Sequence, residues 1–151
     1  MSVIKISIII FLVAIDLISK QAVFHYIDLN NFLSIMSFLD IAHIHNFGIA
    51  FGLFAGLIPY WAITVVSLIV TGFILYMYII SNNKNEKLGM FLILAGAISN
   101  ISDRIVNGYV IDFIYMHYKN FYWPAFNFAD IYISLGVFIL VLQILKDFNK
   151  K

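Results

Sequence analysis

Long apolar stretches alternate with shorter polar ones along the chain, and this pattern predicts its main elements. Residues 57–80 form the longest apolar run and contain no charged residue, and they have the length of one helical membrane crossing, about 20 residues. Residues 88–105 and 128–145 are shorter, and each carries charge near one end. Residues 3–24 begin with Lys5 and a largely apolar run, but they lack the cleavage site of a signal peptide. We therefore expect four uncleaved transmembrane helices over these ranges.

The composition narrows the class of protein. Apolar residues make up 63% of the 151 residues and charged residues 11%, whereas about a quarter of the residues of a soluble domain are charged. A soluble enzyme is therefore excluded, and we expect one integral membrane domain over 1–151. The net charge of +1, without any block of like charges, argues against a nucleic-acid partner. The absence of cysteine excludes disulfides and thiolate chemistry.

The lysines outside the apolar runs predict the orientation, because cytoplasmic loops carry an excess of positive charge. The lysines that fall on one side are Lys5, Lys84, Lys87, Lys146, Lys150 and Lys151. The opposite side receives two longer segments, 25–56 and 106–127, with Lys119 as their clear loop cation. Both termini are therefore expected in the cytoplasm, and both longer segments outside it.

The first outer segment has a pattern of its own. Apolar and polar residues alternate weakly over 39–45, which predicts a β-strand. The glycines Gly48 and Gly52 follow, and glycine permits backbone conformations that a side chain would forbid. The fold expected from the sequence is an all-α membrane protein with four helices and a small extracytoplasmic β element between helices 1 and 2.

Ionisable and amide side chains gather at the predicted outer ends of three of the helices. They are Asp16 and Lys20 in the first helix, Asn100, Asp103 and Arg104 in the third, and Asn127 and Asp130 in the fourth. A charge at the centre of a bilayer costs about 2.5 to 3.5 kcal/mol, so such residues are candidates for a functional site. Pairing between neighbouring opposite charges, such as Asp16 with Lys20 or Asp103 with Arg104, is an alternative that this pattern leaves open.

Asp112 and Asp130 differ from these pairs, because neither has a cation close to it in sequence. Two carboxyl groups brought together at low dielectric share one proton, which supplies a general base and a general acid. Water attack on a peptide carbonyl requires that combination. A structural role for these two carboxylates also stays open.

The histidines give a weaker signal. His43 and His45 would lie on the same face of the predicted strand, and His25 and His117 lie elsewhere in the outer segments. Without cysteine or a His-Glu-x-x-His helix, this set does not have the pattern of a zinc site. We expect no metal and no other cofactor.

Five short motifs follow one another along the chain. They are Asp16-x-x-Ser19-Lys20, Asn46-x-Gly48-x-Ala50-Phe51-Gly52, Asn100-x-x-Asp103-Arg104, Gly108-x-Val110-x-Asp112-Phe113 and Phe126-Asn127-x-Ala129-Asp130. Together they resemble the lipoprotein signal peptidase (signal peptidase II) family of bacterial intramembrane aspartyl proteases. The departures are small: Ile49 stands where the family usually has a small residue, and Ala95 and Ser99 replace glycines.

The resemblance implies a role for each matching residue. It makes Asp112 and Asp130 the catalytic pair and makes Lys20 and Asp103 structural. The residues that it assigns to substrate binding or to support of the pair are Asp16, Asn46, Gly48, Asn100, Arg104 and Asn127. It implies a monomer in the bacterial inner membrane, among membrane lipids, that cleaves lipid-modified prolipoproteins before the diacylglyceryl-cysteine, with its active site toward the extracytoplasmic face.

A small proton- or ion-coupled transporter or channel subunit is the main alternative, since buried charges also mark ion pathways. That function predicts polar groups at several depths, whereas the inner halves of helices 2, 3 and 4 are apolar. A non-catalytic assembly protein would explain the paired charges but not Asp112 and Asp130.

Overall fold

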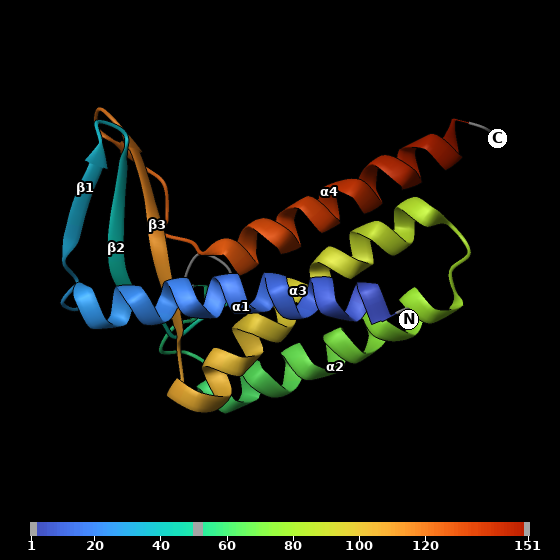
Figure 1. Cartoon of the computed structure of the whole chain (residues 1–151), viewed down its shortest axis with the longest axis horizontal. Helices are drawn as coiled ribbons and strands as arrows, with labels where there is room; N and C mark the ends of the chain where they lie inside the picture. The colour runs from blue at the N-terminus through green and yellow to red at the C-terminus, as the bar shows by residue number, and fades with distance from the viewer. Residues whose placement is uncertain (1–2, 50–52, 150–151) are drawn as a thin grey trace.

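The computed structural model describes residues 3–49 and 53–149, in which four long helices carry a four-stranded antiparallel sheet at one end (Figure 1). The helices are α1 (Val3–Tyr26), α2 (Tyr60–Ile80), α3 (Lys84–Asn107) and α4 (Phe128–Phe148). The strands are β1 (Phe32–Met36), β2 (Leu39–Asn46), β3 (Val110–Tyr118) and β4 (Phe121–Tyr122), in that order across the sheet. The start of α1, the α2–α3 connection and the end of α4 lie at the end opposite to the sheet.

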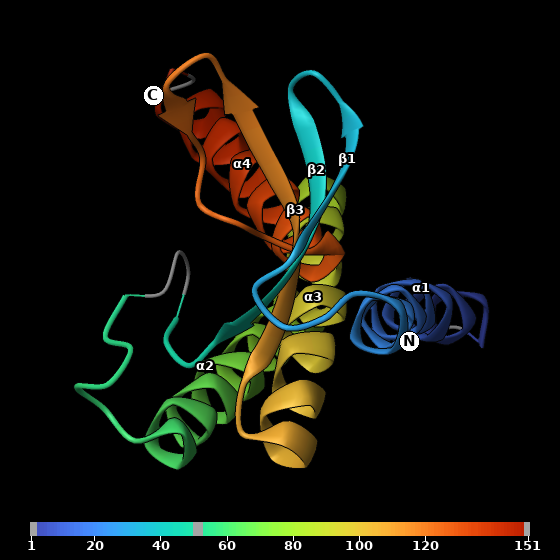
Figure 2. The ribbon, with the colours of Figure 1, turned by 90° about the vertical axis from the view of Figure 1, so that its left-hand side faces the viewer.

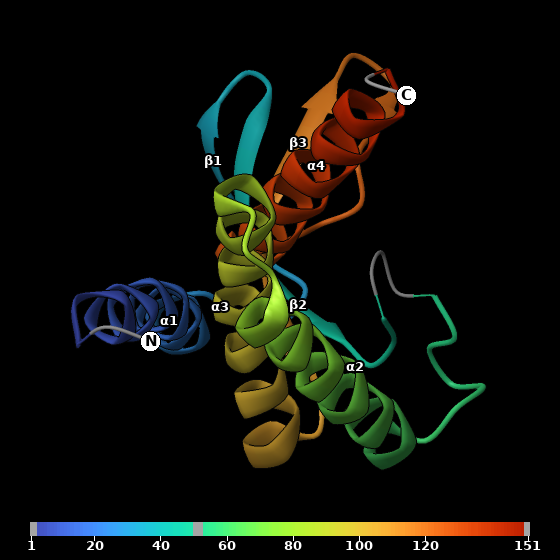
Figure 3. The ribbon, with the colours of Figure 1, turned by 90° about the vertical axis from the view of Figure 1, so that its right-hand side faces the viewer.

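Helix α3 is the centre of the helical part. It contacts α1, α2 and α4, which surround it in the views along the bundle (Figures 2 and 3). Most of α3 is buried, whereas α2 and α4 expose most of their residues, including many large apolar side chains such as Ile69 and Phe138. Contiguous apolar surface of this extent marks contact with lipid or another apolar partner. The exposed faces of α2 and α4 therefore agree with a bilayer as the surrounding solvent.

Three of the described helices, α2, α3 and α4, are long and apolar enough to cross a membrane. This number corrects the expectation of four spans, because α1 is not among them. Helix α1 has 24 residues but carries three charged side chains, Lys5, Asp16 and Lys20. The predicted ranges 57–80, 88–105 and 128–145 correspond to α2, α3 and α4, with ends that differ by up to four residues.

The sheet extends the β structure that the sequence predicts. The strand expected over 39–45 is confirmed as β2 (Leu39–Asn46). The stretch that contains Asp112, expected only as part of the outer segment 106–127, is the strand β3, which pairs with β2 so that Asp112 lies opposite Ile44. The expectation of an all-α fold with one β element between helices 1 and 2 is therefore wrong, because the sheet also contains strands between α3 and α4. The first residues of β3 are all buried, so apolar and polar positions do not alternate there.

Helices α3 and α4 pack with their backbones close together. A methyl group added to Gly96 would overlap the backbone carbonyl of Ala129, and one added to Gly136 would overlap that of Gly89. Small residues permit such close approach between membrane helices. The approach at Ala129 fixes the position of the first turn of α4 relative to α3, and that turn contains Asp130.

Helix caps set where α3 and α4 begin and end. The Asn83 side chain accepts hydrogen bonds from the first backbone N–H groups of α3, and Gly108 ends that helix with a φ of 81°, which favours glycine. Helix α4 begins with a capping box between Asn127 and Asp130. The Ala50-Phe51-Gly52 part of the second motif lies outside the described residues.

Candidate active site

A cavity of about 510 Å³ opens between the sheet and the helices α2, α3 and α4. It brings together five of the residues that the sequence selects: Asn46, Asn100, Arg104, Asp112 and Asp130. Much of the remaining wall is apolar, with Val110 from β3 and Ile131, Ile133 and Leu135 from α4 among its residues. Two carboxyl groups therefore face one largely apolar cavity.

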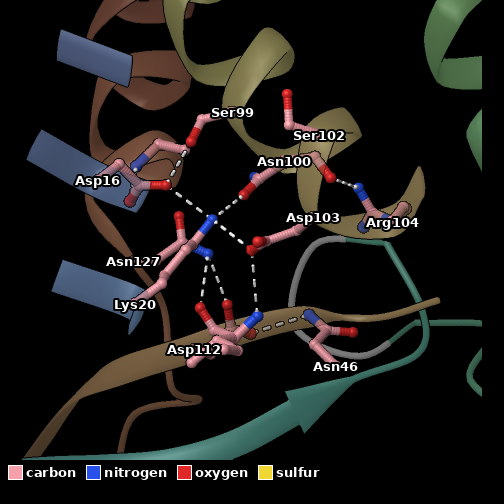
Figure 4. Close-up of polar contacts among 12 residues, drawn as sticks. Asp16, Lys20, Asn46, Ser99, Asn100, Ser102, Asp103, Arg104, Asp112 and Asn127 are labelled. Atoms are coloured by element: carbon pink, nitrogen blue, oxygen red, sulfur yellow. Dashed lines mark hydrogen bonds and ion pairs between the residues drawn. The ribbon is translucent and has the colours of Figure 1, made fainter. Parts of the chain in front are cut away.

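Asp112 lies on β3 and is 3% exposed. Its Oδ1 accepts a hydrogen bond from Asn127 Nδ2 at 2.6 Å, and its Oδ2 accepts one from Asn46 Nδ2 at 2.9 Å (Figure 4). Burial, followed by the negative charge of Asp130, raises the pKa of Asp112 to about 7, although both amide hydrogen bonds favour the carboxylate. A carboxyl group with this pKa exchanges a proton near neutral pH.

Asp130 occupies the first turn of α4 and is partly buried. Its Oδ1 accepts a hydrogen bond from Asn100 Nδ2 at 2.9 Å, and its Oδ2 accepts one from the backbone N–H of Asn127 at 3.2 Å. The capping box alone gives Asp130 a structural function. The bond from Asn100 and the position on the cavity wall are not needed for capping, so the structure supports a second role.

Asn127 connects the two carboxyl groups. Its Oδ1 accepts a hydrogen bond from the backbone N–H of Asp130 at 3.0 Å, so its amide nitrogen is directed toward Asp112. Asn127 is fully buried. One side chain therefore caps the helix that carries Asp130 and holds the carboxylate of β3.

Arg104 and Gly48 close the cavity on the side of the outer segment. Arg104 Nη2 donates a hydrogen bond to the carbonyl oxygen of Gly48 at 2.7 Å, while Asn46 Oδ1 accepts one from the Gly48 backbone N–H at 2.8 Å. The guanidinium group lines the cavity and is 8% exposed. The end of β2 and the last turn of α3 are thereby joined beside the two aspartates.

Comparisons with known proteins agree with this architecture. The sequence profile described as "Signal peptidase (SPase) II" matches residues 8–146. The chain belongs to the signal peptidase II family. A lipoprotein signal peptidase from Thermodesulfovibrio yellowstonii is 43% identical over 143 residues, which cover 94% of this chain and 95% of that protein. One from Francisella tularensis subsp. mediasiatica is 37% identical over 147 residues, which cover 94% and 90%.

A solved structure has the same fold as this member of the signal peptidase II family. It is described as a bacterial membrane enzyme determined at 2.3 Å, and it matches with a TM-score of 0.88 and 27% identity over 97% of this chain and 90% of the other. The resemblance inferred from the five motifs is thus confirmed at the level of the family, and the chain is a member of a peptidase family.

A second group of selected residues, Asp16, Lys20 and Asp103, lies behind the cavity wall in this peptidase (Figure 4). Lys20 Nζ forms ion pairs with Asp16 Oδ2 at 2.7 Å and with Asp103 Oδ2 at 3.0 Å. The pairing of Asp16 with Lys20, which the sequence left open as an alternative, is present. Asp103 pairs with Lys20 of another helix, while Arg104 donates to backbone carbonyl groups.

Sequence reasoning missed two partners of Asp16. Ser99 Oγ donates a hydrogen bond to Asp16 Oδ2 at 2.6 Å, and the backbone N–H of Ala129 donates one to Asp16 Oδ1 at 2.9 Å. Ser99 occurs four residues before Asp103, so both lie on one face of the predicted helix, which is a sequence signal for a polar face. The bond from Ala129 comes from the backbone and leaves no such signal.

His43 and His45 form a contacting pair on β2. His43 Nε2 and His45 Nε2 are 3.0 Å apart, and burial, followed by the charge of His43, lowers the pKa of His45. Within residues 3–49 and 53–149, no three histidine, aspartate or glutamate side chains gather in a way that could hold a metal ion.

Proposed function

We propose that this chain is an intramembrane aspartic endopeptidase that removes the signal peptide of prolipoproteins by cleaving before the diacylglyceryl-modified cysteine. Membership in the signal peptidase II family and similarity to lipoprotein signal peptidases support the substrate class. The observation that carries the aspartic mechanism is that Asp112 and Asp130 line one cavity and that Asn127 donates a hydrogen bond to each of the two carboxylates, from its side chain to Asp112 and from its backbone to Asp130.

In the proposed mechanism, Asp130 takes a proton from a water molecule as its oxygen attacks the carbonyl carbon of the scissile peptide bond. Asp112, with its pKa of about 7, supplies a proton to the carbonyl oxygen. Asp130 then passes the proton that it took from water to the leaving nitrogen as the C–N bond breaks, and Asp112 takes a proton back from a hydroxyl group of the tetrahedral intermediate. Both carboxyl groups return to their starting states, so no covalent intermediate is needed. The residues that we assign to binding and support are Asp16, Asn46, Gly48, Asn100, Arg104 and Asn127.

The membrane placement belongs to the same proposal. We assign α2, α3 and α4 as membrane spans; the exposed face of α1 is largely apolar, and its Asp16 and Lys20 are buried and paired with each other. Lys5 is near the start of α1, Lys84 begins α3 and Lys146 is near the end of α4, and these three helix ends lie opposite to the sheet. The excess of positive charge in the cytoplasm favours that end of the bundle as the inner side. The cavity then faces the extracytoplasmic side of the inner membrane, and a single chain supplies every residue of the site.

The proposal predicts that the purified protein in detergent micelles will cleave a prolipoprotein that carries the diacylglyceryl group. We expect mass spectrometry to find one new amino terminus, at the modified cysteine. The matched substrate without lipid should be cleaved far more slowly, because much of the cavity wall is apolar. Cleavage of neither substrate would contradict the assigned reaction, and cleavage elsewhere would contradict the assigned bond.

A metal chelator serves as a control for the mechanism in the same assay. We expect ethylenediaminetetraacetate to leave the rate unchanged, since both proposed proton-transfer groups are carboxyl groups. Loss of activity that returned with added zinc would argue against the aspartic mechanism. It would direct attention to His43 and His45, whose ring nitrogens already lie 3.0 Å apart.

The proposed role of Asp112 predicts the dependence of kcat/KM on pH. Activity that needs protonated Asp112 should fall as the pH rises through about 7. The hydrogen bond from Asn46 lowers the pKa of Asp112, so Asn46→Ala should raise that pKa and move the alkaline limb upward. A hydrogen bond to a charged group contributes about 1.5 kcal/mol, which corresponds to a shift of about one pH unit.

Asn31→Ala is the matched control for that shift, because Asn31 is an exposed asparagine of the same outer segment. We expect the control to keep the wild-type pH profile. A profile of Asn46→Ala that is lower in amplitude but unmoved along the pH axis would contradict the role of Asp112 as the acid.

A further inference from the structure

Lys20 places a buried ammonium group between α1 and α3, toward the end of these helices that leads into the sheet. The residue is 1% exposed, and its Nζ contacts three oxygen atoms from two helices (Figure 4). These are Asp16 Oδ2 at 2.7 Å, Asp103 Oδ2 at 3.0 Å and Asn100 Oδ1 at 2.8 Å. An ammonium group has three N–H donors and no acceptor, so all of its hydrogen-bonding capacity is used.

Two ion pairs explain why Lys20 is buried, but they do not explain its third bond. That bond reaches Asn100, whose other amide atom, Nδ2, donates to Asp130 Oδ1 at 2.9 Å. If the Asn100 carboxamide were turned by 180°, its NH2 group would face the ammonium group and its oxygen would face the Asp130 carboxylate. One contact would then place donor against donor and the other acceptor against acceptor, so Lys20 permits one orientation of this amide.

The other two asparagines of the site have their orientation fixed in a different way. Asn46 Oδ1 accepts from the backbone N–H of Gly48 and Asn127 Oδ1 from that of Asp130. A backbone N–H is always a donor, so both amide nitrogens are directed toward Asp112. Asn100 is an interior residue of α3, and the donor that fixes its amide is the lysine side chain of α1.

We propose that Lys20 is a positioning residue for Asp130, acting through the carboxamide of Asn100, rather than only a structural cation. The inference rests on the proposed function, in which Asp130 takes the proton from water. Lys20 holds the amide of Asn100 so that the amide nitrogen donates to Asp130 Oδ1. This hydrogen bond keeps the Asp130 carboxylate in one orientation, in which it can accept a proton. Asp16 and Asp103 hold the ammonium group, and Asp16 also binds the backbone N–H of Ala129 beside Asp130.

A double-mutant cycle on kcat separates this role from a structural one. Lys20→Met removes the donor and keeps the length of the side chain, and Asn100→Ala removes the amide. Each single change should lower kcat by about 100-fold, the size of effect that misplacement by about 1 Å can have, with a smaller effect on KM. Lys20→Met should lower kcat little further once Asn100 is alanine, because residues that act as one unit are not additive.

Lys20→Met also leaves Asp16 and Asp103 buried without their cation, and this change alone can unfold the protein. The second arm therefore compares a double variant, which carries both Lys20→Met and Asp103→Asn, with the single variant Asp103→Asn. The double change removes one cation and one anion together. We expect the same loss of kcat in this comparison, and we expect no such loss when Asn100 is alanine. Lys5→Met, at the other end of α1, is the matched control and should retain wild-type kcat.

Each outcome of the cycle has one meaning. If the fold-losses of kcat from Lys20→Met and Asn100→Ala multiply in the double variant, the positioning role is overturned. A Lys20→Met protein with wild-type kcat and reduced thermal stability would overturn it as well. If the wild-type protein did not cleave the lipidated substrate at all, the proposed function would fail instead. The first two results, obtained with an active wild-type protein, concern Lys20 alone.

Discussion

Asp130→Asn and Asp112→Asn should each lower kcat for the lipidated prolipoprotein by about 1,000-fold or more, since general acid–base catalysis contributes about 10²- to 10⁴-fold. An amide neither accepts a proton from water nor donates one to a carbonyl oxygen near neutral pH. At either position the change also leaves one acceptor oxygen where two N–H donors each require one. We therefore expect losses of similar size at the two positions.

The kinetic result must be separated from a loss of folding. Thermal unfolding in the same detergent should show that Asp112→Asn remains folded, and Asp130→Asn should lose about 1 kcal/mol, the typical contribution of a helix cap. Asp28→Asn is the matched control, because Asp28 is an exposed aspartate of the same outer segment. Turnover by a folded Asp112 or Asp130 variant within about tenfold of the wild type would remove the pair from the mechanism.

Gly96→Ala should cause the largest loss of stability among single-methyl additions to the described glycines outside turns. The new methyl group would overlap the backbone carbonyl of Ala129 and lie 2.8 Å from Ile133 Cγ1, so α3 and α4 must move apart. Overpacking of this kind costs about 1 to 3 kcal/mol. Because Ala129 adjoins Asp130, we also expect kcat to fall more steeply than the loss of folded protein explains.

Gly72→Ala in α2 provides the matched control. The same methyl group meets no atom within 4 Å at Gly72, and alanine favours helix over glycine by about 1 kcal/mol. Its unfolding temperature should equal or exceed that of the wild type, measured by scanning fluorimetry in detergent. Equal stability of the Gly96→Ala and Gly72→Ala proteins would show that α3 and α4 are not held at the separation described.

Function follows here from a few polar contacts between elements that are otherwise apolar. Asp112 comes from a strand, Asp130 from the start of α4 and Asn100 from the interior of α3. Each carboxylate oxygen of the two aspartates accepts one N–H donor. Family membership favours a peptidase over the transporter considered from the sequence. The amide network offers a physical reason for three asparagines beside two aspartates.

The site residues could be selected from sequence because polar groups are costly inside a membrane. Asp16, Lys20, Asn100 and Asp130 are conspicuous in apolar segments, and their spacing places them on one face or at one end of a helix. Their partners were harder to predict. Asp103 lies next to Arg104 in the chain, yet its ion pair is with Lys20, more than 80 residues away.

The sequence alone determined that this protein is apolar enough for a membrane, where its four long helices lie, and which polar residues need an explanation. These properties depend on local composition and on a periodicity of a few residues. Only the tertiary structure decided that Asp112 lies on a buried strand, that α3 is the central helix and that Lys20 contacts Asn100. A buried strand lacks alternation, and the direction of an amide depends on donors from distant segments, so neither leaves a local pattern.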